Sequence, residues 1–276
     1  MKLNGGDNPQ GPTTQRRRDD DGRSPWWLEI MKELFVVGAL YTLYKLGRQL
    51  AVGQEHLARA NARVVHTLED QLGLPSGAPI QGWFTDGTLH LANVYYVTAH
   101  FPVALTFLIW GFTVRPRVEY VWARNLLLVQ TFLALILHIT LPLAPPRMFP
   151  EWGFRDTMER IGPSAYDGAS ATISNQFAAM PSLHVGWAVL FAVVVARTAA
   201  PPLRVLAGAH AAITMLVVIV TANHWWSDGV VAVALLGIAL CIFPGPGRGR
   251  SRSLLTGRRP DPSRRGARTR GSDAVH

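Results

Sequence analysis

Six apolar runs, separated by polar and basic segments, dominate the chain between residues 26 and 243. They span residues 26–46, 91–114, 122–143, 185–199, 205–222 and 226–243. A helix that crosses a bilayer needs about 20 residues, so the shorter runs must include flanking Trp and polar residues at the membrane surface. The pattern predicts an all-α, polytopic membrane protein with about six transmembrane helices, the first of which contains Lys32 and Glu33.

The segment between the first and second runs, residues 47–89, is more polar but keeps an apolar pattern of helical period. Its apolar positions recur on one side of the helical wheel: Leu57, Val64, Val65, Leu68 and Leu72. This pattern predicts an amphipathic helix that lies at the membrane interface. The stretch from Leu74 to Gly77, which contains Pro75, is expected to end it.

Both ends of the chain are polar and lack the residues that an apolar core requires. We therefore expect a disordered N-terminal tail over residues 1–25 and a disordered, Arg-rich cytoplasmic tail over residues 244–276. The domain between them, residues 26–243, is the predicted six-span membrane domain and contains all the candidate chemistry described below. The one cysteine, Cys241, excludes a disulfide framework.

Composition supports a membrane protein and argues against a nucleic-acid partner. Charged residues make up 16% of the chain, whereas about 25% is usual in soluble domains. The net charge of +9 comes from basic residues at the ends of the apolar runs and in the tails, which is the distribution that membrane topology produces. Because no aromatic residues are interleaved with the arginines of the C-terminal tail, we expect that tail to contact anionic lipid rather than RNA.

The order of the runs predicts which segments share a membrane face. By parity, the loop of residues 144–184 and the corner of residues 224–228 lie on the same side. Most of the 27 basic residues fall on the other side, including Arg115, Arg117, Arg124, Arg197, Arg204 and those of both tails. Basic loops stay cytoplasmic, so we expect a multi-pass protein of the cell membrane with extracytoplasmic chemistry and cytoplasmic tails.

Three short motifs meet on the predicted outer face, and together they contain one Arg, two His and one Asp. His224 and Asp228 are four residues apart, which would place them on one face of a helix. A carboxylate beside an imidazole holds one tautomer and makes the other ring nitrogen a better nucleophile. Arg147 is a planar cation suited to two phosphate oxygens. Ser182 and the first amides of the following helix can bind the same anion, and His184 can act as acid or base.

These motifs resemble those of the type 2 phosphatidic acid phosphatase superfamily. The segments Leu141–Arg147 and Asn175–His184 are similar to the branch of inositol phosphorylceramide synthase and its bacterial relatives. The resemblance covers roughly residues 47–243. It implies an integral membrane enzyme that acts on a lipid phosphate or phosphodiester and needs no metal or cofactor.

The same resemblance implies a role for each site residue. His224 would attack phosphorus to give a phosphohistidine, Asp228 would orient its ring, His184 would protonate the leaving oxygen, and Arg147 would hold the phosphate. An alcohol or water would then resolve the intermediate. The branch favours transfer to a polyol such as inositol, although no residue in the sequence decides between transfer and hydrolysis.

The sequence departs from the family pattern at positions that normally hold cations. Thr140 stands where a Lys is typical, and Val217-Val218 stand where a Ser-Arg pair is typical; Met148 and Leu183 replace a Pro and a Gly. Because two phosphate-binding cations are missing, we expect a phosphodiester rather than a phosphomonoester substrate. Arg155 or Arg160 would be the residue to replace them.

Two other functions remain open from the residues alone. The two His and one Asp could hold zinc with an open coordination position. Alternatively, the protein could be a transporter that uses the histidines inside its apolar runs, namely His100, His138 and His210. For these three, hydrogen bonding between helices is the favoured interpretation. Trp225 and Trp226 are predicted to be interfacial anchors.

Overall fold

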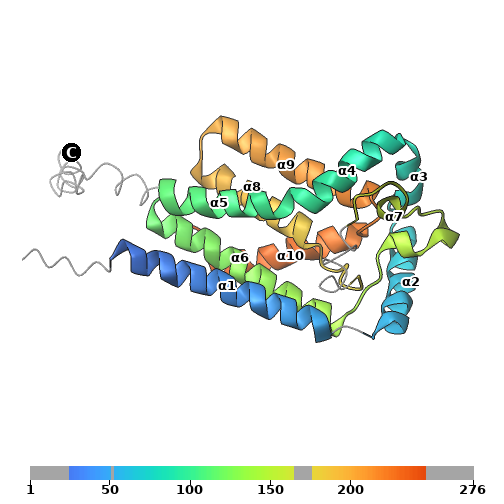
Figure 1. The fold of residues 1–276 in the computed structure, drawn as a ribbon, viewed down its shortest axis with the longest axis horizontal. Helices are drawn as coiled ribbons and strands as arrows, with labels where there is room; N and C mark the ends of the chain where they lie inside the picture. The colour runs from blue at the N-terminus through green and yellow to red at the C-terminus, as the bar shows by residue number, and fades with distance from the viewer. Residues whose placement is uncertain (1–24, 51–52, 165–175, 247–276) are drawn as a thin grey trace, which may run out of the picture. The chain divides into compact units, whose positions relative to one another are not determined.

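The computed structural model describes residues 25–50, 53–164 and 176–246, and within them the chain is helical throughout, with no strand (Figure 1). The predicted all-α class is therefore confirmed. The predicted tails, residues 1–25 and 244–276, lie outside the described residues except for Pro25 and residues 244–246. The helices are α1 (Trp26–Leu50), α2 (Glu55–Gln71), α3 (Gly77–Gly82), α4 (Asp86–Thr98), α5 (His100–Val114), α6 (Arg117–Thr140), α7 (Thr157–Ile161), α8 (Leu183–Thr198), α9 (Pro201–Val220) and α10 (Trp226–Ile242).

Among these helices, α6 and α9 are long and apolar enough to cross a membrane. Helices α4 and α5 make a third candidate if they form one bent span. The apolar helices α8 and α10 have 16 and 17 residues, fewer than the roughly 20 that a bilayer requires. The apolar runs predicted from sequence thus correspond to helices, but the described residues establish two or three candidate spans, and the predicted six are not all established.

The bend between α4 and α5 has an identifiable cause. Pro102 lies in the first turn of α5 and has no N–H to donate to the carbonyl of Thr98, and its ring crowds that carbonyl. The two helices are accordingly bent by 46° at Ala99. Sequence patterning predicted one continuous span here, and the bend is the correction.

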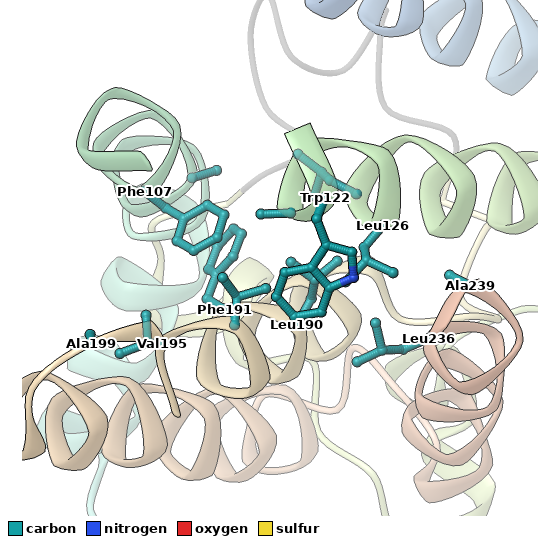
Figure 2. Close-up of a cluster of buried hydrophobic side chains, with 13 residues drawn as sticks. Phe107, Trp122, Leu126, Leu190, Phe191, Val195, Ala199, Leu236 and Ala239 are labelled. Carbon is teal, nitrogen blue, oxygen red and sulfur yellow. The ribbon is translucent and has the colours of Figure 1, made fainter. Parts of the chain in front are cut away.

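An apolar cluster formed by α5, α6, α8 and α10 is the centre of the bundle (Figure 2). Phe107 of α5 stacks on Phe191 of α8 with ring centroids 4.3 Å apart. The amide of Gln130 on α6 donates to the carbonyl of Ala232 on α10 at 2.9 Å. Gly186 on α8 lies directly against Gln130, so the absence of a side chain there permits the close approach of α6, α8 and α10.

The bundle has two chemically different ends (Figure 1). The connections α5–α6 and α8–α9 lie at one end, where Trp122 donates to the carbonyl of Phe243 at 2.9 Å. The end of α6, the start of α8, the end of α9 and the start of α10 meet at the other end, beside α2, α3 and α7. As predicted from parity, the loop after α6 and the corner before α10 therefore lie together.

Helix α2 confirms the predicted amphipathic helix between the first two apolar runs, with shorter bounds. Its small residues Ala58 and Ala62 are fully buried against the site end of the bundle. Its larger apolar residues remain exposed: Leu57, Val64, Leu68 and Leu72. An exposed apolar row opposite a buried row of small residues is the pattern expected of an interfacial helix.

Candidate active site

The pair of His224 and Asp228 lies in the turn between α9 and α10. The Nδ1 atom of His224 is 3.1 Å from Oδ2 of Asp228 and 2.8 Å from the carbonyl oxygen of Ala179. Oδ2 of Asp228 also accepts from the backbone N–H of Trp225 at 2.9 Å, which caps α10. His224 thus precedes the helix, so the contact comes from the geometry of the helix start and not from two residues stacked on one helical face, as the spacing had suggested.

These contacts define the tautomer of His224. A carbonyl oxygen and a carboxylate are both acceptors, so Nδ1 must carry the proton and donate to them. In the neutral ring, the lone pair is then on Nε2. Both side chains are buried, with 6% of His224 and none of Asp228 exposed. The pair therefore presents one basic nitrogen, Nε2, in a fixed orientation.

The turn that carries His224 has an unusual backbone. Ala222 has a φ of 52°, in the left-handed region, and is fully buried. For a residue with a side chain this conformation costs roughly 1–2 kcal/mol, and such residues occur where the surrounding structure holds them in place. Two contacts hold this one, because the carbonyl of Ala222 accepts from the backbone N–H of Arg147 at 2.9 Å, and Asn223 donates to the hydroxyl of Thr221 at 2.8 Å.

Arg147 lies directly against this turn, in the 3-10 segment Pro146–Met148. Each of its guanidinium nitrogens has a partner: Nε donates to Asn223 at 3.2 Å, Nη1 to Asp156 at 3.0 Å and Nη2 to Gln176 at 3.1 Å. Only 7% of the residue is exposed. The guanidinium is thus held beside the residue that precedes His224, and the carboxylate of Asp156 is its anionic partner.

Ser182 and His184 stand at the start of α8, as the sequence predicted. The backbone N–H of Ser182 donates to the carbonyl of Asp228 at 3.1 Å, which joins the start of α8 to the start of α10. The hydroxyl of Ser182 caps α8 by accepting from Val185 at 3.4 Å. His184 is half-buried, and its ring centroid is 6.2 Å from that of His224. The structure therefore brings all five predicted site residues to one end of the bundle.

Helix α2 secures the loop that carries Arg147. The carbonyl of Ala58 accepts from the backbone N–H of Ala144 at 3.1 Å, and Asn61 donates to the carbonyl of Pro142 at 2.8 Å. On its other side, the loop pairs with the segment before α8, since Leu143 donates to the carbonyl of Phe177 at 2.7 Å. The loop is thus fixed from both sides.

Glu69 of α2 reaches the catalytic turn itself, which the sequence did not indicate. Its carboxylate accepts from the backbone N–H and the hydroxyl of Ser227 at 2.8 and 2.7 Å. Burial raises the pKa of Glu69 above its ordinary value, the charge of Asp228 acts in the same direction, and the two Ser227 bonds oppose both. His66 and Glu69 line a small pocket that extends to His224. The amphipathic helix α2 and the turn that carries His224 are therefore in direct contact.

The tryptophans of this turn differ from expectation. Trp225 is buried, with 3% exposed, and donates to the carbonyl of Ala144 at 2.9 Å, so its predicted role as an interfacial anchor is wrong. Trp226 donates to the carbonyl of Pro75 at 2.7 Å. Both indole N–H groups thus connect the turn to neighbouring loops, because a Trp N–H needs an acceptor where water is excluded.

The positions that depart from the family pattern carry no charge toward the site. Val217 and Val218 are buried in the apolar core, and the hydroxyl of Thr140 donates to the carbonyl of Ile136 within α6. Of the suggested substitutes, Arg155 donates to the carbonyl of Gln81 at 3.1 Å, and Arg160 is exposed at the end of α7.

The histidines inside the apolar runs make contacts that favour a structural role for two of them. His138 donates from Nε2 to the carbonyl of Pro181 at 3.1 Å, and Nδ1 of His210 is 2.6 Å from the hydroxyl of Tyr95. His100 differs because its ring lies 4.2 Å from that of His184. Within the described parts of the chain, no group of three His, Cys, Asp or Glu side chains is arranged to hold a metal ion, so the zinc alternative gains no support.

Several residues at the site carried no recognisable sequence signal. Asp156, Gln176 and Asn223 surround Arg147. Gln176 belongs to the family-like segment Asn175–His184, but neither that segment nor the positions of Asp156 and Asn223 predicted a contact with Arg147. Tyr96, from the middle of an apolar run, has its hydroxyl 3.5 Å from Nε2 of His224. The hydroxyl of a tyrosine within an apolar run was the only signal in the sequence. Such a hydroxyl occurs equally on tyrosines that only pack between helices, so it does not identify a site residue.

The fold and the site together define a helical membrane protein with an Arg, two His and an Asp at one end of its bundle. Comparison with known families agrees, because the family model of the PAP2 superfamily matches residues 63–242. The chain belongs to the PAP2 superfamily, which supports an enzyme of the phosphatase or phosphotransferase type acting on lipid phosphates. Neither the curated proteins nor the solved structures include a match to this chain.

Proposed function

We propose that this protein is a lipid phosphotransferase of the cell membrane that works through a phosphohistidine on His224. The observation that carries the proposal is the double acceptor at Nδ1 of His224, which leaves a basic Nε2 at the site end of the bundle. His184 stands 6.2 Å away between ring centroids, close enough to serve the same phosphoryl group. Family membership supports the reaction type.

In the first step, Nε2 of His224 forms a bond to phosphorus and the bond from phosphorus to the leaving oxygen breaks. The leaving oxygen takes a proton from the His184 imidazolium. Asp228 and the carbonyl of Ala179 stabilise the positive charge that develops on the phosphorylated ring through their bonds to Nδ1. Arg147, and Ser182 at the start of α8, bind the phosphoryl oxygens.

In the second step, the now neutral His184 takes the proton of an acceptor hydroxyl. The acceptor oxygen bonds to phosphorus and the bond between phosphorus and nitrogen breaks, which restores both histidines. We propose a polyol such as inositol as the acceptor and a phosphodiester lipid as the donor, in line with the inositol phosphorylceramide synthase branch. Among the described residues, Arg147 is the permanent cation at this turn, and Val217 and Val218 are buried where the family pattern has a Ser-Arg pair, which favours the single negative charge of a phosphodiester. Hydrolysis, with water as acceptor, is the alternative.

Trapping of the intermediate tests the covalent mechanism. An octyl 4-nitrophenyl phosphodiester should transfer its octylphosphoryl group to His224 of the wild-type protein and release 4-nitrophenolate. Mass spectrometry after a rapid quench that avoids acid should detect this substituted phosphohistidine. His184→Ala should still form the intermediate from this good leaving group and then accumulate it, because the general base of the second step is missing. His224→Ala should form none. Turnover by His224→Ala would contradict the proposal, and phosphate on His184 would reverse the two roles.

The acceptor is tested separately with a labelled lipid phosphodiester and candidate alcohols. Transfer of the label to inositol in preference to water would support a phosphotransferase. If the label is released by hydrolysis, and alcohols do not change the rate of that release, the protein is a hydrolase and not a phosphotransferase. A chelator should leave either activity unchanged, since no metal takes part in the proposed steps.

A further inference from the structure

Tyr96 contacts both histidines of the site. Its hydroxyl is 3.5 Å from Nε2 of His224, and its ring is stacked on that of His184 with centroids 4.2 Å apart and planes 17° apart. Only 8% of the residue is exposed. One side chain of α4 thus contacts both the proposed nucleophile and the proposed acid.

The hydroxyl of Tyr96 is a donor toward His224. Because Nδ1 of His224 carries the proton, Nε2 can only accept, and the phenol O–H of Tyr96 lies 3.5 Å from it. When Nε2 bonds to phosphorus it loses its lone pair and no longer accepts from this hydroxyl. The oxygens on that phosphorus are acceptors within its reach, and a neutral donor can bind them where the chain has Val217 and Val218 in place of a Ser-Arg pair.

The ring of Tyr96 belongs to a stack that determines the position of His184. His100 also packs on His184, with centroids 4.2 Å apart, and Trp187 stacks on His100 at 4.5 Å. Tyr96 and His100 lie on either side of the bend between α4 and α5, whereas His184 and Trp187 are one turn apart in α8. Tyr96 and His100 are four residues apart, a spacing that places both rings on the face that meets the imidazole of His184.

We propose that Tyr96 is a further active-site residue: its hydroxyl donates to the phosphoryl group during transfer, and its ring positions His184 as the proton donor. This assignment rests on the proposed phosphohistidine mechanism. It makes two separable claims, since Tyr96→Phe removes the hydroxyl and keeps the ring, while Tyr96→Leu removes both.

The neighbouring residue provides a matched control. The hydroxyl of Tyr95 points to α9, where it lies 2.6 Å from Nδ1 of His210 and 3.0 Å from the hydroxyl of Thr214. Tyr95→Phe therefore removes a phenol hydroxyl from the same helix without touching either site histidine. Any loss common to both Phe variants would come from helix packing.

The experiment measures the rate of phosphohistidine formation on His224 with two substrates, octyl 4-nitrophenyl phosphodiester and dioctyl phosphodiester. The leaving group of the first substrate is 4-nitrophenolate, which needs little protonation. The leaving group of the second is octanol, whose oxygen must be protonated as it departs. Tyr96→Phe should slow both substrates equally by about three- to tenfold, the scale of one hydrogen bond. Tyr96→Leu should slow the dioctyl substrate at least about tenfold more than the nitrophenyl substrate, because proton donation by a misplaced His184 is lost. Tyr95→Phe should match the wild type.

A purely structural role would predict a different pattern, in which Tyr96→Leu slows both substrates by the same factor. That pattern, or wild-type rates in Tyr96→Phe, would overturn the assignment. Thermal unfolding of each variant in detergent shows whether it is folded, and the conservative Tyr96→Phe keeps the test valid if Tyr96→Leu does not fold. Absence of phosphohistidine in the wild type would refute the proposed function itself, whereas an unchanged Tyr96→Phe refutes the role of Tyr96 alone.

Discussion

At the scale of single residues, Asp156 already pairs with the cation that we propose binds the substrate phosphate, so the two anions would compete for Arg147. Oδ2 of Asp156 accepts from Nη1 of Arg147, while Oδ1 caps α7 by accepting from Met158 and Glu159 at 3.0 Å each. The two oxygens thus have separate roles, one on Arg147 and one on the helix. A carboxylate near a bound anion weakens binding of that anion, and the effect increases where water is excluded.

Asp156→Asn separates these two roles. The amide oxygen of Asn can keep the helix cap, which leaves its NH₂ group facing the guanidinium, where it cannot accept. With the negative charge and the Arg147 contact both removed, we expect KM for octyl 4-nitrophenyl phosphodiester to fall about threefold or more, with unchanged Tm. Asp156→Ala is the control, since it also removes the cap and should cost about 1 kcal/mol of stability. A rise in KM together with a fall in kcat would show that Asp156 orients Arg147 and does not compete.

The sequence predicted Arg147, His184 and His224 far better than the tyrosine that contacts both histidines. Those three residues stand in short motifs at the ends of apolar runs, so parity alone places them together. Tyr96 stands inside a run, and its contacts depend on how α4 packs against α8 and the turn before α10. Contacts of that kind arise from tertiary structure, and a single chain without an alignment carries no pattern for them.

At the scale of helices, α8 depends on a glycine to reach its neighbours. A Cβ at Gly186 would lie 2.9 Å from the amide nitrogen of Gln130 and 3.4 Å from Cβ of Ala232. The same Gln130 amide makes the bond to α10. In a membrane, where lipid is as apolar as the helix surfaces, close packing and such hydrogen bonds are what hold helices together.

Gly186→Ala should therefore destabilise the protein by about 1–3 kcal/mol through overpacking. Gly208→Ala is the matched control in α9, because a Cβ there meets nothing within 4 Å. Gly208→Ala should leave the free energy of unfolding unchanged or raise it by up to about 1 kcal/mol, since Ala is the better helix former. Thermal unfolding of both variants in detergent measures the difference. Equal Tm values would show that Gln130 can move aside at no cost.

The helices also show what periodicity can and cannot predict. The apolar runs correctly marked α6, α8, α9 and α10, because a long apolar run in this context forms a helix whatever its neighbours are. The bend in the run of residues 91–114 was missed although its cause, Pro102, was visible in the sequence. The short helices α3 and α7 lie in polar loops, where capping by Ser76 and Asp156 sets their starts and no periodicity announces them.

At the scale of the whole molecule, the two ends of the bundle should face opposite sides of the membrane. The site end includes the start of α4, and the other end includes the α8–α9 connection (Figure 1). Arg115, Arg117, Arg197 and Arg204 all belong to the end without the site. The proposed orientation, with the site outside the cell, follows from that asymmetry.

Thiol labelling tests this orientation. Cys241 is exposed and must first be replaced, so Cys241→Ala is the background. In intact cells, a membrane-impermeant maleimide should label Asp86→Cys, which is exposed at the site end, and should not label Pro202→Cys, which is exposed at the other end. After permeabilisation both should react. Labelling of Pro202→Cys alone in intact cells would reverse the orientation.

The contacts of α2 limit how far this protein can be truncated from its N-terminal side. The family match starts at residue 63, inside α2, and so leaves out Ala58, Arg59 and Asn61. Those three residues bond to Ala144, Met148 and Pro142, on either side of Arg147. A truncated form that begins at residue 63 would retain every residue proposed for the chemistry, but it would lose the hydrogen bonds that fix the loop carrying Arg147. The smallest functional fragment must therefore begin before Glu55.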